Sequence, residues 1–525
     1  MKSLDQERFA ELLSWAKRLG SGLDPNVEVY DDAVTRFSLR VKEGGHHLSP
    51  GDAVMTCHMA TSFSFINALL GAPLTSHRTE INEPDDTRRF PSEFINSVPP
   101  HVVGRFYLMK QYLQGKESFW WPYIRTLPQP ENVQSWSLPV FWPDDDASFL
   151  EGTNAGVATE EMQSNLKREF KHARRLLKDL DVRGWQDYTR LLYNWSFSIF
   201  TSRSFRPSLV LSEQVQDIVL PLLPPGCRLD DFSILLPVFD LANHSLTSRI
   251  QWDLSSQPEG CRLVTHDAYS PGAQVYNNYG RKTNGELLLA YGFVLPETEE
   301  LHNDYFHLRK RVDTASTPSE APSAASAAGG SSAGPPRDFL VSLRPINAPS
   351  SLVGRARQCV ARDPDFRIRP EFSHVEDSLI WDLCTMGLAA EEKDQLLDTA
   401  VPPDTPLGPS ASALPEVSNS ETALRQQREH ECLRRILSGA SDGVEGMAAV
   451  VQKVKDILLA KLGYEYDKLC ETDPVGTGED GEEVQIEPVN ENQALALLYR
   501  TQCRKVLENA IGSLVPGWQD EVGGG

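Results

Sequence analysis

The chain has 525 residues, of which 40% are hydrophobic, 24% charged and 9% aromatic. This composition excludes a wholly disordered chain, a collagen and a disulfide-dense small protein, and the length predicts at least two hydrophobic cores. The 51 Lys and Arg residues against 73 Asp and Glu residues give a formal net charge of −22. Such a surface repels nucleic acids and anionic lipids on average, so we expect a basic protein partner and neither a nucleic acid nor a membrane.

In the N-terminal part, runs rich in Val and Tyr, broken by Gly, Ser and Pro, predict hairpins over 26–57. Apolar residues at helical spacing predict helices over 101–116, 159–180 and 185–200. Short runs between 233 and 280 then predict strands, beginning with the apolar run Ser-Ile-Leu-Leu-Pro-Val-Phe. Several short strands with interposed helices favour an α+β domain, and no glycine-rich phosphate loop follows any of them.

Residues 315–336 contain Ala, Ser, Gly or Pro at 20 of 22 positions. Large apolar side chains that could offset the entropy of ordering are missing there, so we expect a disordered linker over 306–337. Beyond it, apolar residues return every three or four positions, and Asn490 can cap a last helix. We therefore expect a helical C-terminal domain over 338–525.

The eight cysteines are scattered singly, without a C-x-x-C or C-x-C pair that could begin a zinc site. Reduced thiols in the cytoplasm or the nucleus fit this pattern, and we expect no metal. The acidic run 144–146 is more typical of a solvated loop than of a cation site. The first 20 residues lack the apolar core of a signal peptide, and no apolar run reaches the roughly 18 residues of a membrane span.

Two motifs carry the functional argument. The first is Asp-Leu-Ala-Asn-His at 240–244, and the second is Tyr-Gly-Arg-Lys-Thr-Asn-Gly-Glu-Leu, which begins at Tyr279. Together with Gly-Lys-Glu-Ser-Phe-Trp-Trp-Pro-Tyr-Ile-Arg-Thr-Leu-Pro at 115–128 and Ser-Arg-Ser-Phe at 202–205, they resemble the SET-domain protein methyltransferases. The resemblance is to the branch of the Rubisco large-subunit lysine methyltransferase, with its ribosomal-protein, elongation-factor and actin-histidine relatives.

This resemblance covers almost the whole chain and implies an α+β fold. A SET β-fold over 1–305 would contain a helical insert at about 85–200, and an all-α C-terminal domain would bind the substrate protein. The implied activity is S-adenosylmethionine-dependent protein-lysine N-methylation, without a metal. In such a reaction a neutral amine must line up behind a sulfonium methyl group, so positioning in a closed channel supplies much of the acceleration.

The resemblance also implies roles for individual residues. Asn243 and His244 would hold S-adenosylmethionine with support from Asp240, and Arg203 would pair with the carboxylate of the cofactor. The implied cofactor-binding residues are Thr35, Phe37, Arg203, Asp240, Asn243, His244 and Tyr279.

On the substrate side, Tyr279 would be the catalytic tyrosine, and Phe205 and Tyr291 would line an aromatic channel for the substrate nitrogen. One position departs from the resemblance. The relatives usually carry Gly-x-Gly in the first cofactor loop, where this chain has Arg36-Phe37-Ser38. Backbone approach to the cofactor is less assured without those glycines.

Each residue also has a purely structural interpretation. Asp240, Asn243 and His244 could form a turn whose side chains satisfy backbone groups. Arg203 could cap the C-terminal end of a helix or form a surface ion pair, and Tyr291 could simply fill the core. Trp120, Trp121 and Tyr123 are expected in the core, and no role is assigned to the doublet Asn277-Asn278. The joint presence of the two motifs favours function over these readings.

Two other functions stay open. Methylation of a histidine side chain is one alternative, because the resembled branch includes an actin-histidine enzyme. A non-catalytic binding module is the other, and Arg36-Phe37 in place of the glycine pattern supports it. Many histone-directed SET enzymes carry a cysteine-rich segment soon after the catalytic tyrosine, and none follows Tyr279. The resemblance therefore favours a non-histone substrate, such as a ribosomal protein or translation factor, and we expect a monomer.

Overall fold

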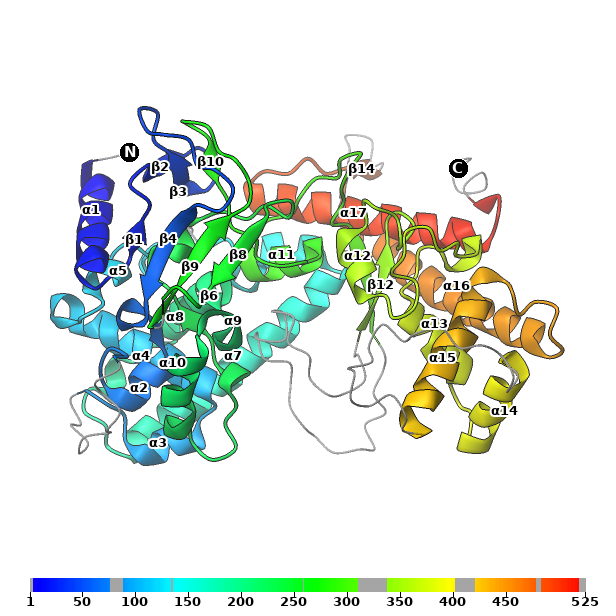
Figure 1. Ribbon diagram of the computed structural model, residues 1–525, viewed down its shortest axis with the longest axis horizontal. Helices are drawn as coiled ribbons and strands as arrows, with labels where there is room; N and C mark the ends of the chain where they lie inside the picture. The colour runs from blue at the N-terminus through cyan, green and yellow to red at the C-terminus, as the bar shows by residue number, and fades with distance from the viewer. Residues whose placement is uncertain are drawn as a thin grey trace. The chain divides into compact units, whose positions relative to one another are not determined.

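The computed structural model describes residues 3–75, 88–133, 136–257, 259–309, 338–401, 421–477 and 483–518. These residues divide into two compact units (Figure 1). The first unit takes its residues from 3–141 and 161–280, and the second from 142–160, 281–309 and 338–518. In the part of the chain that the structure describes, no helix is long and apolar enough to cross a membrane.

The strands of the first unit are short, and they pair antiparallel in three small sheets within the described residues. The sheet orders are β1-β4-β9-β8, β10-β3-β2 and β5-β7-β6. The strands are β1 Gly22–Leu23, β2 Val27–Asp32, β3 Arg36–Val41, β4 Ala53–His58, β5 Phe63–Ser64, β6 Ser204–Phe205, β7 Ile234–Leu235, β8 Ile250–Asp253, β9 Gly260–Thr265 and β10 Gln274–Val275.

The helices of the first unit include those expected from apolar spacing. The predictions over 101–116, 159–180 and 185–200 are confirmed by α4, α7 and α8. The helix α7 begins in the second unit and continues into the first. The helices are α1 Ser3–Arg18, α2 Phe65–Leu70, α3 Ser92–Ser97, α4 Pro100–Gln114, α5 Trp121–Ile124, α7 Asn154–Asp179, α8 Arg190–Arg203, α9 Pro207–Val210 and α10 Glu213–Val219.

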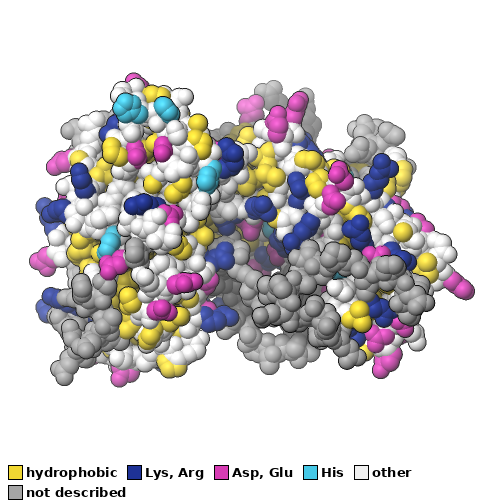
Figure 2. Space-filling model, in the orientation of Figure 1, with side chains coloured by type: hydrophobic (Ala, Val, Ile, Leu, Met, Phe, Trp, Pro, Cys, Tyr) yellow, Lys and Arg dark blue, Asp and Glu magenta, His cyan; other side chains and the backbone are white. Residues whose placement is uncertain are grey.

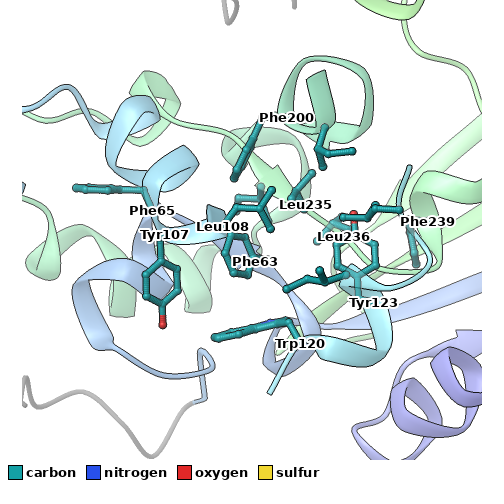
Figure 3. Close-up of a cluster of buried hydrophobic side chains, with 14 of the residues drawn as sticks. Phe63, Phe65, Tyr107, Leu108, Trp120, Tyr123, Phe200, Leu235, Leu236 and Phe239 are labelled. Atoms are coloured by element: carbon teal, nitrogen blue, oxygen red, sulfur yellow. The ribbon is translucent and has the colours of Figure 1, made fainter. Parts of the chain in front are cut away.

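The core of the first unit joins these helices to the β5-β7-β6 sheet. Figure 3 shows aromatic and leucine side chains from both packed together, with Phe63 of β5 at the centre and Trp120 and Tyr123 along one side. The ring of Phe63 stacks on that of Tyr107 with ring centroids 5.4 Å apart, and it packs edge-to-face with Trp120 with centroids 5.1 Å apart. Because large aromatic side chains bury much apolar area, this cluster fixes the sheet that carries the functional segments.

A buried charged network holds α4, α7 and α8 together. Oε2 of Glu169 accepts hydrogen bonds from Arg105 at 2.8 Å and from the Tyr193 hydroxyl at 2.7 Å. Its Oε1 lies 3.1 Å from Nε2 of His101. Burial disfavours the carboxylate, but Arg105 and the hydrogen bonds outweigh burial and lower the pKa of Glu169 to about 2. The ionised glutamate therefore ties three helices to one another.

The second unit is mainly helical, as expected for the C-terminal part. Two short antiparallel pairs accompany its helices, β11 with β12 and β13 with β14. The elements are α6 Asp144–Ala147, α11 Asn284–Tyr291, β11 Tyr305–Arg309, β12 Asp338–Ser342, α12 Leu352–Arg357, α13 Asp377–Thr385, α14 Ala390–Ala400, α15 Glu421–Ser438, α16 Met447–Glu471, β13 Val475–Thr477, β14 Glu483–Gln485 and α17 Glu491–Leu514. Of the expected linker, residues 306–309 belong to β11, and 310–337 lie outside the described residues.

The N-terminus of α17 shows where one prediction is right and another wrong. Asn490 caps the helix as expected, and its side chain accepts a hydrogen bond from the backbone N–H of Gln493 at 3.0 Å. Asp146 is buried, whereas the sequence predicted a solvated acidic run. Its carboxylate accepts hydrogen bonds from the side-chain amides of Asn490, Asn492 and Gln493 at 2.8 to 2.9 Å. A negative charge at a helix N-terminus also complements the helix dipole.

The charges on the face drawn in Figure 2 are mixed. Lys and Arg side chains alternate there with Asp and Glu side chains, and hydrophobic side chains are scattered among them. The excess of acidic residues in the sequence is therefore not gathered into one acidic patch on this face.

Candidate active site

The strand β7 ends in a strained turn that leads to the first motif. The sequence predicted a strand over 233–239, but β7 covers only Ile234–Leu235. Pro237 has no N–H for a ladder, and Val238 has a φ of +80°, which a β-branched residue rarely adopts. Val238 is fully buried, so the surrounding core holds this conformation. A short 3-10 helix over Phe239–Leu241 follows and carries Asp240.

The two motifs meet, as the resemblance implies. The backbone N–H of Asn277 donates to the carbonyl of Asn243 at 2.8 Å, which aligns the two segments. Two residues later, the backbone N–H of Tyr279 donates to Nδ1 of His244 at 3.0 Å. The hydroxyl of Tyr279 donates to the carbonyl of Ala242 at 2.9 Å. Segments about 35 residues apart in sequence thus form one continuous site, and the rings of His244 and Tyr279 stack with centroids 5.0 Å apart.

The hydroxyl of Tyr279 is neutral at physiological pH. Burial raises the pKa of Tyr279 to about 12, while the charge of Arg203 lowers it and that of Asp240 raises it. Since its proton is donated to Ala242, the phenol oxygen acts as an acceptor toward other groups. Nδ1 of His244 accepts the N–H of Tyr279, which assigns the imidazole proton to Nε2.

Arg203 and Asp240 form a buried ion pair beside these segments. Nη1 of Arg203, the last residue of α8, lies 3.2 Å from both the backbone oxygen and Oδ2 of Asp240. The hydroxyl of Tyr123 donates to the same Oδ2 at 2.9 Å. The Asp240 side chain is 1% exposed and that of Arg203 is 26% exposed. Burial raises the pKa of Asp240, and Arg203 and Tyr123 oppose this effect.

The turn between β2 and β3 is joined to the first motif. Oδ1 of Asp32 accepts hydrogen bonds from the backbone N–H groups of Val34 and Thr35, at 3.0 and 2.8 Å, and from the Thr35 hydroxyl at 2.9 Å. The Thr35 hydroxyl in turn accepts a hydrogen bond from the side-chain amide of Asn243 at 2.8 Å. Asp32 thus orders the loop, and Thr35 connects the loop to Asn243.

The aromatic residues named on the sequence lie in different places. Phe37 packs against Phe9 of α1 with ring centroids 4.7 Å apart. Phe205 in β6 is half-buried and meets the edge of Trp252 at 5.4 Å. Tyr291 ends α11 in the second unit and is half-buried. Cofactor contact by Phe37 and substrate contact by Phe205 and Tyr291 stay predictions.

Comparisons with curated proteins point to protein-lysine methyltransferases, although no protein-family model matches the chain. The ribosomal lysine N-methyltransferase set10 of Schizosaccharomyces pombe is 32% identical over 204 residues, which are 39% of this chain and 33% of that protein. The protein-lysine N-methyltransferase EFM1 of Saccharomyces cerevisiae is 24% identical, over 55% and 50% of the two chains. The human N-lysine methyltransferase SETD6 is 27% identical, over 56% and 60%. The chain thus spans less than two thirds of each of these relatives.

A solved structure extends the comparison to nearly the whole chain. The SET domain of LSMT with bound lysine and AdoHcy matches 98% of this chain and 92% of its own, with a TM-score of 0.50 and 13% identity. A second structure of the same domain, with methyl-lysine and AdoHcy, gives a TM-score of 0.51. The chain has a SET-domain fold. The expected α+β fold class and the resemblance to the Rubisco methyltransferase-like branch are thereby confirmed.

Within this SET-domain fold, Arg36 adopts a backbone conformation that favours glycine, the residue that the resemblance implies for this loop. Its φ is +70°, in the left-handed region that glycine enters most easily. Such a conformation costs a non-glycine residue roughly 1 to 2 kcal/mol. The loop therefore keeps its turn without glycine, because Asp32 and the β2–β3 pairing hold it from both sides.

Two contributors to the site were not found from the sequence. Tyr123 was expected only in the core, yet its hydroxyl holds Asp240. The doublet Asn277-Asn278 shapes the approach to Tyr279. The side-chain amide of Asn278 donates to the carbonyls of Leu246 and Ser248 at 3.0 and 3.2 Å, and its Oδ1 accepts the backbone N–H of Gly280 at 2.9 Å. A polar pair at the end of a strand was the available signal.

Proposed function

We propose that the chain is a protein-lysine N-methyltransferase that uses S-adenosylmethionine. The contact that carries the proposal is the one between Tyr279 and the Ala242–His244 segment, because it builds one site from the two motifs. The names of the curated relatives and the SET-domain fold support the same reaction class.

The residues of the first unit fit the chemistry of this cofactor. S-adenosylmethionine carries a carboxylate, and Arg203 uses only Nη1 for hydrogen bonds within the described residues, which leaves Nε and Nη2 as donors. Burial lowers and Asp240 raises the pKa of Arg203, with a net increase, so the guanidinium stays charged. The amide of Asn243 donates to Thr35, and its Oδ1 is left as an acceptor for a polar ligand edge. We infer that Thr35, Phe37, Asp240 and His244 shape the same pocket.

S-adenosylmethionine supplies, when bound, an electrophilic methyl group on a sulfonium. The chain supplies acceptors for weak C–H hydrogen bonds, the Tyr279 oxygen and nearby carbonyls, each worth roughly 0.5 to 1 kcal/mol. Because the pKa of Tyr279 is about 12, its phenol presents this acceptor without a negative charge. A substrate lysine has an ordinary pKa of about 10.4, and burial beside a cation favours loss of its proton before attack. Phe205 is the aromatic residue of the first unit that we propose to contact that amine.

Labelled S-adenosylmethionine tests this proposal. The pure protein, incubated with it and a cell extract, should label a discrete protein band on lysine. Tyr279→Phe should reduce the label at least about tenfold, since one hydrogen bond in a closed site is worth on the order of 1.4 kcal/mol. Tyr107→Phe is the matched control, a buried tyrosine whose hydroxyl makes no hydrogen bond within the described residues. Labelled histidine, or no binding of the cofactor by calorimetry, would contradict the proposal.

We further propose that the substrate is a basic, non-histone protein, such as a ribosomal protein or a translation factor. We also propose that the enzyme is a monomer in the cytoplasm, the nucleus or both, and that it binds neither nucleic acid nor membrane. The net charge of −22 and the missing cysteine-rich segment after Tyr279 support the substrate. Methylated peptides compared between cells with and without the protein would identify it. Light scattering tests whether the protein is a monomer, and fluorescence microscopy tests its location. Binding to RNA or to anionic vesicles would contradict the proposal that the protein binds neither nucleic acid nor membrane.

A further inference from the structure

Tyr123 combines a fixed ring with a functional hydroxyl. Figure 3 shows its ring inside the core cluster, close to Leu236 and Phe239. The short helix α5 that carries it is held on its N-terminal side, where the indole N–H of Trp120 donates to the carbonyl of Ser62 at 3.0 Å. The ring therefore has little freedom, and its hydroxyl is aimed at Oδ2 of Asp240 at 2.9 Å.

The surroundings of Asp240 make this hydroxyl important. Four titratable side chains act on Asp240 from the elements packed around it, Arg203, Tyr123, Tyr279 and Cys57. Of these, only Arg203 is a cation. Arg203 and Tyr123 both donate to Oδ2, whereas Oδ1 is buried without a hydrogen-bond partner within the described residues. The charged form of the carboxylate thus depends on two donors to one oxygen.

We propose that Tyr123 is a positioning residue for the cofactor, whose hydroxyl holds the Asp240 carboxylate in the orientation that fixes Arg203. With Nη1 held by Asp240, the remaining guanidinium nitrogens face a ligand carboxylate in one defined geometry. This inference rests on the proposed function and adds a residue that does not itself touch the cofactor.

Loss of the hydroxyl has a consequence that a packing defect does not share. Burial already raises the pKa of Asp240, and Tyr123 is one of the groups that lower it. In Tyr123→Phe the pKa of Asp240 rises further, so the carboxyl takes up a proton as the pH falls. A neutral carboxyl holds the guanidinium less tightly, because the ion pair is lost and the backbone oxygen of Asp240 stays as the partner of Nη1. The affinity for the cofactor should then fall as the pH falls. Tyr123 and Tyr279 do not contribute to this profile, since burial raises both of their pKa values above the range tested.

Calorimetric titration with S-adenosylmethionine between pH 6 and pH 9 tests the inference. Tyr123→Phe should bind about tenfold more weakly than wild type at pH 7, and its loss relative to wild type should be larger at pH 6 and smaller at pH 9. Asp240→Asn should bind weakly at every pH, and the double variant no more weakly than Asp240→Asn alone. Tyr107→Phe, from the same core cluster, should bind like wild type throughout. The series is repeated with Cys57→Ala, which removes a thiol near Asp240. Contact with Cys261 lowers the pKa of the Cys57 thiol, so this repeat excludes its titration as the source of the pH dependence.

Several outcomes overturn the inference. Wild-type affinity in Tyr123→Phe would do so, and so would an equal loss at every pH together with a lower melting temperature, which indicates damaged packing. If Tyr123→Phe does not fold, Asp240→Asn tests the inference instead. Wild-type affinity in Asp240→Asn would show that the carboxylate through which Tyr123 acts is not needed for cofactor binding. Failure of the wild type to bind the cofactor contradicts the proposed function itself, and is thereby distinguished from failure of the inference.

Discussion

Glu169→Gln should destabilise the first unit and remove part of its acid sensitivity. The pKa of Glu169 is about 2 in the folded chain against an ordinary value of 4.5. Since each pKa unit corresponds to about 1.4 kcal/mol, the ionised carboxylate stabilises the fold by about 3 kcal/mol. The same figure follows from breaking a buried ion pair, which costs roughly 3 to 5 kcal/mol because Arg105 is left without its partner. The side chain of Glu169 is 22% exposed, so solvent screens little of this effect.

The sign follows from the direction of the shift. A carboxyl with a lowered pKa stabilises the fold fully above its ordinary value, and this contribution is lost as pH falls from about 4.5 toward 2. His101 acts in the same direction, because burial lowers its pKa and its protonation at acid pH opposes folding. Protonation of Glu169 therefore removes about 3 kcal/mol in the wild type, whereas the glutamine side chain of the variant has no carboxylate to protonate.

Urea denaturation as a function of pH measures this difference. At pH 7 the variant should unfold with a free energy about 3 kcal/mol lower than wild type, and the two should converge near pH 2 to 3. Glu160→Gln, which changes an exposed glutamate on the same helix, is the control and should leave the curve unchanged. A constant difference between Glu169→Gln and wild type across this pH range would refute the reasoning.

Three further changes have expected outcomes in urea denaturation. Arg36→Gly should raise the free energy of unfolding by about 0.5 to 1 kcal/mol. Glycine removes the cost of the left-handed conformation, roughly 1 to 2 kcal/mol, and part of this gain is offset because an unfolded glycine has more conformational entropy. A decrease in stability would contradict the interpretation that Arg36 is strained. Burial raises the pKa of Asp304 to about 6 from an ordinary 3.8, so Asp304→Asn should stabilise the second unit by up to about 3 kcal/mol at pH 8 and by little at pH 4. An effect independent of pH would contradict that assignment. Asn490→Ala should cost about 1 to 2 kcal/mol through loss of the α17 cap, and an unchanged midpoint would show that the cap is dispensable.

Helical periodicity predicted the long elements well. The helices α7 and α17 bury one face, so the spacing of their apolar residues carries the information, whereas α4 and α8 are buried around most of their middle turns. The strands were harder, because several contain only two residues and their ends depend on partners far along the chain. The apolar run at 233–239 looks like one strand, yet Pro237 and the left-handed Val238 turn it out of the sheet after Leu235.

Long-range polar contacts explain what the sequence missed. Asp146 was expected in solvent, because the three amides that surround it come more than 340 residues later in the chain. Tyr123 lies in a run rich in tryptophan that is typical of a core, and its ring does lie in the core. Its hydroxyl contacts Asp240 across 117 residues, and apolar spacing contains no signal for such a contact.

The motif residues that meet in the first unit show which kind of inference reaches a site. The resemblance of the two motifs to the SET-domain methyltransferases pointed to Asp240, Asn243, His244 and Tyr279, which residue type alone did not distinguish from a structural turn. The glycine rule then argued against the first loop, because Arg36 stands where backbone freedom is needed. That argument concerns the type of residue, whereas the loop requires only a left-handed backbone conformation. Arg36 adopts this conformation, with a φ of +70°. A missing glycine therefore weakens a motif energetically without removing the turn, and the hydrogen bond from Asn243 to Thr35 shows that the loop still reaches the first motif.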